Sequence, residues 1–308
     1  MKVGIVGAGL VGATAGYAIG MLRTANEVVL VDRDGDLAQA QAADILHAMP
    51  FASSTRVMAG GYDALADADV VIIAAGVNQK PGESRLALLS RNVSVFEEVI
   101  AQILAVVPNP ILLIATNPVD VMTTVALRLS GLPPARVIGS GTILDTARFR
   151  ALLAQHLGVA YRSVHAYVLG EHGDSEVLGW SGARVGTMAV DAFAAQVRMP
   201  LTEAIRERID GGVRRAAYTI ISGKGATNYG IGGGLARIVQ AIAQDERAVL
   251  SLSAESATLT DYPKVAFSVP RLLGADGLMA ELSPTLNDAE REALHSSAAL
   301  LKKTADAL

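Results

Sequence analysis

The leading candidate for acid–base chemistry is a histidine that lies between two glycines. His172 belongs to the segment Gly170-Glu171-His172-Gly173-Asp174-Ser175, which follows an apolar, strand-like run at residues 164–168. An imidazole in a turn can exchange a proton near neutral pH, because its ordinary pKa is about 6.5. A histidine that merely completes the turn is the alternative. His47, His156 and His295 lie in helical patterns and are weaker candidates.

An aspartate and an arginine three positions apart could bind a carboxylate substrate. Asp145 and Arg148 fall on one face of a predicted helix at residues 143–157. Apolar residues surround them, so we expect at least one of the two to be buried. A buried arginine needs an anion, and its planar guanidinium matches a carboxylate through two parallel hydrogen bonds. An ordinary surface ion pair is the alternative.

Two loops carry further polar candidates. The loop from Gly76 to Arg85 contains Gly82 and Pro81 and leads into a predicted helix, which is typical of a mobile lid. An arginine such as Arg85 on a lid can exclude water and polarise a carbonyl, although a solvated turn is equally compatible with these residues. In the loop at residues 225–230, Thr227 is a small polar residue that could line a pocket.

The beginning of the chain has the spacing of a dinucleotide site. Gly7, Gly9 and Gly12 follow an apolar run at residues 3–6, and a second apolar run at 28–31 ends on Asp32. The first glycine permits a tight turn, the second lets backbone N–H groups approach a pyrophosphate, and the third lets helix and strand pack closely. Asp32 can accept hydrogen bonds from both ribose hydroxyls and would repel a 2′-phosphate. We therefore predict NAD as the cofactor.

Alternating strands and helices must position these residues. Strands are predicted near residues 2–7, 27–32, 55–59, 69–75, 111–115 and 136–140, with helices near 9–22, 35–47, 86–106 and 120–130. This alternation predicts an α/β fold with a doubly wound parallel (Rossmann) sheet. Later strands are expected near 163–168, 184–188, 248–252 and 264–268, with helices near 143–157, 202–221 and 287–306. We expect an NAD-binding domain of residues 1–140 and a catalytic α+β domain of residues 141–308.

Composition narrows the possible partners. The 308 residues carry a formal net charge of −4, which argues against nucleic acid or an anionic membrane as a partner. The chain has no cysteine, so disulfides and thiolate chemistry are excluded, and the histidines show no metal-ligand spacing. Apart from the glycine-rich beginning of the chain, no apolar stretch is long enough to approach a membrane-spanning helix. We expect a cytoplasmic enzyme without a metal.

The ordered set of motifs resembles the L-lactate/L-malate dehydrogenase family. The resemblance covers the whole chain and is carried by five segments, namely Gly7–Gly12 with Asp32, Asn78–Arg85, Ala115–Asp120, Leu144–Arg148 and Gly170–Ser175. It implies NAD-dependent hydride transfer between a 2-hydroxy acid and a 2-oxo acid. A non-catalytic NAD-binding protein on the same fold would have no reason to combine these residues, but it stays as a distant alternative.

The resemblance also implies roles for individual residues. Arg148 holds the substrate carboxylate, His172 transfers the proton, and Asp145 accepts a hydrogen bond from the second ring nitrogen. Arg85 stabilises charge on the substrate oxygen, with Asn117 near that oxygen and Thr227 lining the pocket. The implied cofactor positions are Gly7, Gly9, Val11, Gly12, Asp32, Tyr62, Gly76, Val77, Ala115, Asn117 and Ser140.

Substrate choice within this family depends on the lid. Gln79 is neutral and is expected to face the group on carbon 3 of the substrate. An unpaired second carboxylate would be penalised there, whereas an arginine would neutralise it. Gln79 therefore favours the interconversion of pyruvate and L-lactate, which is the last step of homolactic fermentation. The interconversion of oxaloacetate and L-malate stays as the alternative.

A regulatory site is the last expectation. The resemblance implies that Arg150 and His165 bind fructose 1,6-bisphosphate at a subunit interface, as they would in bacterial members activated by that compound. It also implies a homotetramer. From the residues alone, the favoured interpretation is a surface arginine and an edge-strand histidine with unrelated partners; only the resemblance favours the effector site.

Overall fold

The parallel sheet that positions the candidate residues has its helices on both faces. A computed structural model describes residues 1–77, 85–256 and 258–308; the lid residue Gln79 lies outside this part, as does the side chain of Arg85. Within it, the strands β6-β5-β4-β1-β2-β3 lie side by side in that order and pair in parallel. Their bounds are β1 Lys2–Val6, β2 Glu27–Val31, β3 Arg56–Ala59, β4 Val70–Ile73, β5 Ile111–Ile114 and β6 Val137–Gly139.

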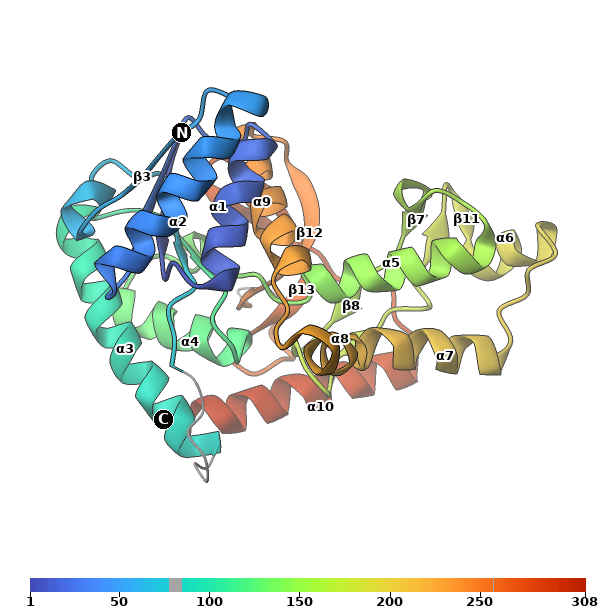
Figure 1. Ribbon diagram of the computed structural model, residues 1–308. Coiled ribbons are helices and arrows are strands. Elements are labelled where there is room, and N and C mark those ends of the chain that lie inside the picture. The colour runs from blue at the N-terminus through green and yellow to red at the C-terminus, as the bar shows by residue number, and fades with distance from the viewer. Residues whose placement is uncertain (78–84, 257) are drawn as a thin grey trace.

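Two hydrophobic cores flank this sheet. One core joins it to α1 (Leu10–Met21), α2 (Gly35–Ala48) and α9 (Tyr229–Ala243). The other joins it to α3 (Arg85–Val106), α4 (Val119–Ser130) and α10 (Asp288–Ala305). Strands such as β4 and β5 are apolar throughout because both of their faces are buried. The predicted doubly wound fold is confirmed (Figure 1).

The sheet does not stop at the expected domain boundary. Strand β12 (Ala248–Glu255) pairs antiparallel with β6 through Ser253 and Gly139, and β13 (Ala266–Gly274) and β14 (Gly277–Glu281) extend the same sheet. A continuous sheet therefore crosses residue 140. The division into residues 1–140 and 141–308 stays a prediction.

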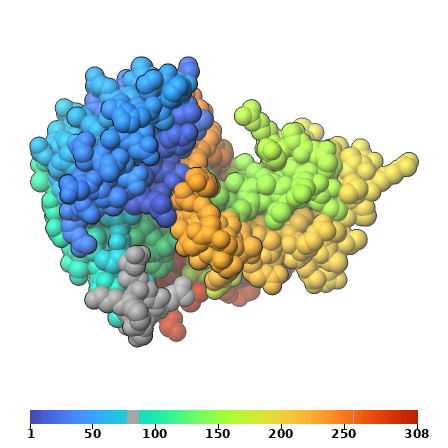
Figure 2. Space-filling model, viewed as in Figure 1, coloured from blue at the N-terminus to red at the C-terminus, as the bar shows by residue number. Residues whose placement is uncertain are grey.

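The second half also forms a projecting lobe with its own core. Helix α5 (Ile143–Leu157) packs beside α7 (Glu203–Arg214) and contacts small strands of the lobe (Figure 1). Figure 2 shows how the lobe projects from the rest of the molecule. The remaining elements of this part of the chain are β7 Val164–His165, β8 Val168–Leu169, β9 Val177–Leu178, β10 Arg184–Val185, β11 Met188–Ala189, α6 Val190–Gln196 and α8 Ala216–Lys224.

Three predicted elements in this half are divided. The strand expected at 163–168 breaks after His165, because β7 pairs with β10 while β8 pairs with β9 in a different sheet. The strand expected at 184–188 is a hairpin that turns at Gly186, where φ is +57°. The helix expected at 202–221 ends at Arg214 and resumes as α8, because the backbone of Arg215 leaves the helical conformation, with φ −93° and ψ 0°. Helix α7 buries Ile209 and Val213, whereas α8 buries no residue.

The described helices give no sign of a membrane segment. None of those in residues 1–77, 85–256 and 258–308 combines the length and the apolar composition that crossing a bilayer requires.

Candidate active site

The glycine turn after β1 leaves space for an anion at the start of α1. Gly7 has a φ of +104°, and a Cβ there would lie 2.5 Å from the backbone nitrogen of Ala75. At Gly12, a Cβ would lie 1.9 Å from the carbonyl oxygen of Gly7. At Gly9, no atom lies within 4 Å of the added Cβ, and no side chain caps the helix that begins there. The N–H groups of this helix end are thus suited to a pyrophosphate, so the turn fits a dinucleotide.

Asp32 is held in place at the end of β2. Its Oδ2 accepts a hydrogen bond from the backbone N–H of Ala8 at 2.7 Å, and its Oδ1 accepts one from the N–H of Asp34 at 2.9 Å. It lines a cavity of about 380 Å³ together with Gly7, Tyr62 and other residues. A fixed carboxylate in such a cavity can bind ribose hydroxyls, as the sequence predicted.

The other expected cofactor positions lie along the same edge of the sheet. Gly76 and Val77 follow β4, and they line the cavity that contains Asp32. Ala115 follows β5 directly, Asn117 lies two residues further, and Ser140 follows β6. Val11 lies in the first turn of α1. Because parallel strands end at one edge, all of these positions gather there.

Two residues that the sequence analysis missed stabilise this edge. The hydroxyl of Thr116 donates to the carbonyl oxygen of Ala75 at 2.6 Å, which ties the ends of β4 and β5 together. The side-chain oxygen of Asn92, on α3, accepts a hydrogen bond from the N–H of Val77 at 2.9 Å. Both contacts join segments distant in sequence, so no local pattern indicates them.

The expected proton-transfer group is assembled on α5 and the loop after β8. His172 Nδ1 lies 2.6 Å from Oδ2 of Asp145, and Nη1 of Arg148 donates to the other carboxylate oxygen at 2.8 Å. Asp145 is 2% exposed, whereas the His172 side chain is 26% exposed. The carboxylate therefore holds one ring nitrogen and leaves Nε2 for a substrate.

The charges around His172 favour the protonated imidazole. Burial alone lowers the pKa of His172, but the hydrogen bond and charge of Asp145, with the charges of Asp120 and Glu176, raise it to about 9. Burial opposes the ionised form of Asp145 too, yet His172 and Arg148 hold the pKa of that carboxyl below its ordinary value. The pair is thus an imidazolium beside a carboxylate at neutral pH, and it can donate a proton.

The loop that carries His172 is anchored from two helices. The N–H of His172 donates to Oδ2 of Asp120, on α4, at 2.7 Å. The N–H of Glu171 donates to Oγ of Ser297, on α10, at 2.9 Å. Ser297 is fully buried, and Ser175 shares a hydrogen bond with it at 2.9 Å. The sequence analysis assigned no role to Asp120 or Ser297, although Asp120 lies in a segment that it quoted.

Thr227 and Asn117 lie in two other loops. Thr227 is half-buried between α8 and α9, and its neighbour Asn228 donates to the hydroxyl of Thr14 at 3.0 Å. A Cβ at Gly230 would lie 2.8 Å from Leu144, which places this segment against the start of α5. Asn117 is exposed at the turn between β5 and α4. Arg85 is the first residue of α3, but its side chain and Gln79 lie outside the described residues.

The expected regulatory residues lie on the projecting lobe. Nε of Arg150 donates to the carbonyl oxygen of Ala166 at 2.8 Å, and its guanidinium lies 4.8 Å from the centre of the Tyr167 ring. His165 is exposed on β7 and pairs in register with Arg184. Arg150 thus lies against the segment that carries His165.

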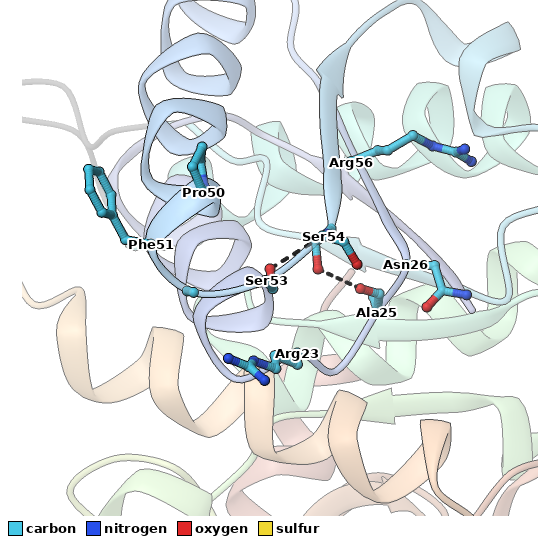
Figure 3. Close-up of a pocket in the computed structure, with 10 residues that line it drawn as sticks. Arg23, Ala25, Asn26, Pro50, Phe51, Ser53, Ser54 and Arg56 are labelled. Atoms are coloured by element: carbon cyan, nitrogen blue, oxygen red, sulfur yellow. Dashed lines mark hydrogen bonds between the residues drawn. The ribbon is translucent and has the colours of Figure 1, made fainter.

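A polar hollow elsewhere does not compete as the active site. It is lined by Arg23, Asn26, Ser53, Arg56 and their neighbours, at the amino ends of β2 and β3 (Figure 3). Arg23 and Arg56 point away from each other in this view, and Arg56 pairs with Glu27 at 2.6 Å. Ligands of doubly wound sheets bind at the opposite, carboxyl ends of the strands. In the described part of the chain, no group of His, Asp and Glu side chains could hold a metal ion.

A dinucleotide cradle beside an imidazolium–carboxylate pair defines an NAD(P)-dependent dehydrogenase. Comparison with known families makes this specific: residues 1–139 match the lactate/malate dehydrogenase NAD binding domain, and residues 142–308 match the alpha/beta C-terminal domain of the same family. The chain belongs to the lactate/malate dehydrogenase family, and its cofactor is NAD. The resemblance and the NAD prediction are confirmed.

Individual relatives are similar over their whole length. The L-lactate dehydrogenase of Thermus aquaticus is 61% identical over 308 residues, covering 100% of this chain and 99% of the relative. That of Allorhizobium ampelinum is 61% identical over 305 residues, covering 99% and 98%. A solved lactate dehydrogenase from a Medee basin deep-sea metagenome library has a TM-score of 0.96 at 42% identity, covering 99% and 98% of the two chains.

The buried Asp120 makes the stability of the fold depend on pH. Burial raises the pKa of Asp120 to about 6, although the hydrogen bond from His172 favours the ionised form. When the pKa of a carboxyl is higher in the folded state than in the unfolded state, the fold loses stability as the pH rises from the unfolded-state pKa to the folded-state pKa. Asp120→Asn keeps an oxygen for the His172 N–H but does not ionise. The free energy of unfolding of this variant, measured relative to that of the native protein, should therefore increase by up to about 3 kcal/mol when the pH rises from about 4 to about 7.

Thermal unfolding of Asp120→Asn and of the native protein, at about pH 4 and at about pH 7, measures this difference in free energy of unfolding. Asp44→Asn, at an exposed position on α2, is the control and should follow the native protein. A constant offset between Asp120→Asn and the native protein at the two pH values would contradict the prediction.

Proposed function

We propose that this protein is an L-lactate dehydrogenase that reversibly converts pyruvate and NADH to L-lactate and NAD. The observation that carries the proposal is the His172–Asp145 pair, with Nδ1 of the ring 2.6 Å from the carboxylate, next to Arg148. The similar proteins of Thermus aquaticus and Allorhizobium ampelinum are both L-lactate dehydrogenases, which supports the same reaction here.

The chemistry follows from the charges of these groups. Bound NADH supplies the hydride that reaches carbon 2 of pyruvate. Arg148 binds the substrate carboxylate, and His172 donates the proton on Nε2 to the ketone oxygen. Asp145 stabilises the imidazolium before the transfer and fixes the orientation of the ring. In the reverse direction, the neutral ring accepts the proton of the lactate hydroxyl.

The remaining proposed substrate contacts surround the ketone oxygen and carbon 3. Arg85 stabilises the negative charge that develops on the oxygen, Asn117 hydrogen-bonds near it, and Thr227 lines the pocket. Gln79 faces the methyl group of pyruvate. The roles of Gln79 and the Arg85 side chain rest on the sequence motif alone.

Replacement of the neutral lid residue tests the substrate assignment. Gln79→Arg should shift the ratio of kcat/KM values toward oxaloacetate by roughly 100-fold or more, the factor expected for pairing an otherwise unpaired carboxylate in a water-poor site. Steady-state NADH oxidation with pyruvate and with oxaloacetate measures the ratio. Gln196→Arg, which adds the same charge at an exposed position on α6, should leave the ratio unchanged. A native protein that already prefers oxaloacetate would refute the assignment.

We further propose that fructose 1,6-bisphosphate activates the enzyme through Arg150 and His165 in a homotetramer. Both residues lie at the α5–β7 contact, since Arg150 donates to Ala166, the residue after His165. Cations from two subunits repel each other at an interface, and a bisphosphate between them would relieve this repulsion and favour the assembled state. A cytoplasmic role in fermentation is consistent with such an effector.

Saturation curves with and without the effector test this second proposal. About 1 mM fructose 1,6-bisphosphate should lower the KM for pyruvate about fivefold or more, the lower end of common coupling energies, and should do so most strongly at low salt. Arg150→Gln should abolish this activation, whereas Arg162→Gln, at an exposed position nearby, should not. Unchanged native curves would refute the effector site.

A further inference from the structure

Glu176 is a buried acid that the proposed mechanism leaves without a role. It lies four residues after His172 and is only 3% exposed. Its Oε1 atom has no hydrogen-bond partner among the residues that the structure describes. Burial of a carboxyl oxygen without a partner is unfavourable, so stability alone does not explain this side chain.

Charged groups of α5, of α7 and of its own loop act on Glu176. The backbone N–H of Glu176 donates to the carbonyl oxygen of Gly173, the residue after His172, at 3.1 Å, and Arg214 on α7 donates to the carbonyl oxygen of Asp174 in the same loop. The charges that act on Glu176 belong to Asp145, Arg214, His172 and Asp210. Helices α5 and α7 pack side by side (Figure 1). Glu176 therefore belongs to a loop that contacts α5 through His172 and α7 through Asp174.

The charge of Arg214 lowers the pKa of Glu176, but the hydrogen bonds of its guanidinium go to other groups. Nε of Arg214 donates to Asp210 at 2.5 Å, and Nη1 donates to the carbonyl oxygen of Asp174 at 3.0 Å. Burial and the charge of Asp145 together raise the pKa of Glu176 to about 8. The carboxyl is thus neutral at pH 7 and acquires its charge as the solution becomes alkaline.

We propose that Glu176 acts through His172 as an electrostatic positioning residue, whose ionised carboxylate holds the proton on the imidazole in alkaline solution. The negative charge of Glu176 stabilises the imidazolium, in addition to the charges of Asp145 and Asp120 that already face the ring. Pyruvate reduction requires the imidazolium, so this device extends reduction to higher pH. The inference rests on the proposed function, since it assigns His172 as the proton donor.

The pH profile of pyruvate reduction tests the inference with Glu176→Gln. At about pH 6.5 the native carboxyl is neutral, so the variant should reduce pyruvate at a similar rate. On the alkaline side, the fall in its kcat/KM should begin roughly half a unit to one unit earlier in pH. This makes the variant about two- to fivefold slower near pH 9 and about three- to tenfold slower well above that pH. Lactate oxidation requires the neutral imidazole, so its acid limb should move to lower pH by the same amount. A purely structural defect would lower both reactions without this paired shift.

Direct titration of the imidazole separates this inference from the proposed function. In the protein with isotope-labelled histidine rings, comparison with His172→Asn assigns the NMR signal of His172. Its midpoint should move to lower pH in Glu176→Gln by the same half to one unit. If the midpoint moves but native protein fails to reduce pyruvate, the proposed function is refuted and the effect of Glu176 on His172 stands.

Two further variants keep the test decisive. Glu176→Met removes the charge without leaving a buried amide to be satisfied, and it should give the same shift if the glutamine variant folds poorly. Glu207→Gln removes a charge from an exposed position on α7 and should leave the profile unchanged. An unchanged midpoint of His172 in whichever of the two Glu176 variants folds would overturn the inference.

Discussion

The hydrogen bond between His172 and Asp145 is the interaction on which the rest of the site depends. At 2.6 Å, with the carboxylate 2% exposed, it stabilises the protonated imidazole, which the proposed function uses as the proton donor. It needs a buried acid that stays ionised, and Arg148 supports that ionisation from the same helix. The loop that carries the ring is anchored by Asp120 and Ser297. Three elements distant in sequence thus hold one proton in position.

The parallel sheet supplies the second constraint, because the proposed function places hydride transfer and proton transfer at one of its edges. The glycine turn after β1, Asp32 after β2 and Ser140 after β6 all lie where parallel strands end. Strands β12 and β13 extend the sheet beyond β6, and Gly170 forms a β-bridge with Ser268 of β13. The loop of His172 is thereby attached to the same sheet that carries the dinucleotide turn, which fixes the two halves of the chemistry relative to each other.

Local patterns predicted the parts of this site that depend on local geometry. The glycine spacing identified the turn at Gly7, and the i,i+3 spacing placed Asp145 and Arg148 on one helix face. The apolar residues around them predicted that at least one of the two would be buried. The partnership of His172 with Asp145 came only from the family resemblance, because 27 residues separate the two. Asp120 and Ser297 escaped notice because their contacts span 52 and 126 residues. The run at residues 163–168 was wrongly predicted as one strand, since alternating apolar residues do not reveal that β7 and β8 pair with different partners.

Replacement of the proton donor tests the central claim most directly. His172→Asn preserves the size of the side chain and should leave NADH binding, measured by fluorescence titration, close to that of the native protein. Single-turnover oxidation of the bound NADH by saturating pyruvate should slow at least ~10²-fold, the lower end of the contribution of general acid catalysis. A variant that binds NADH and oxidises it with pyruvate at the native rate would contradict the account.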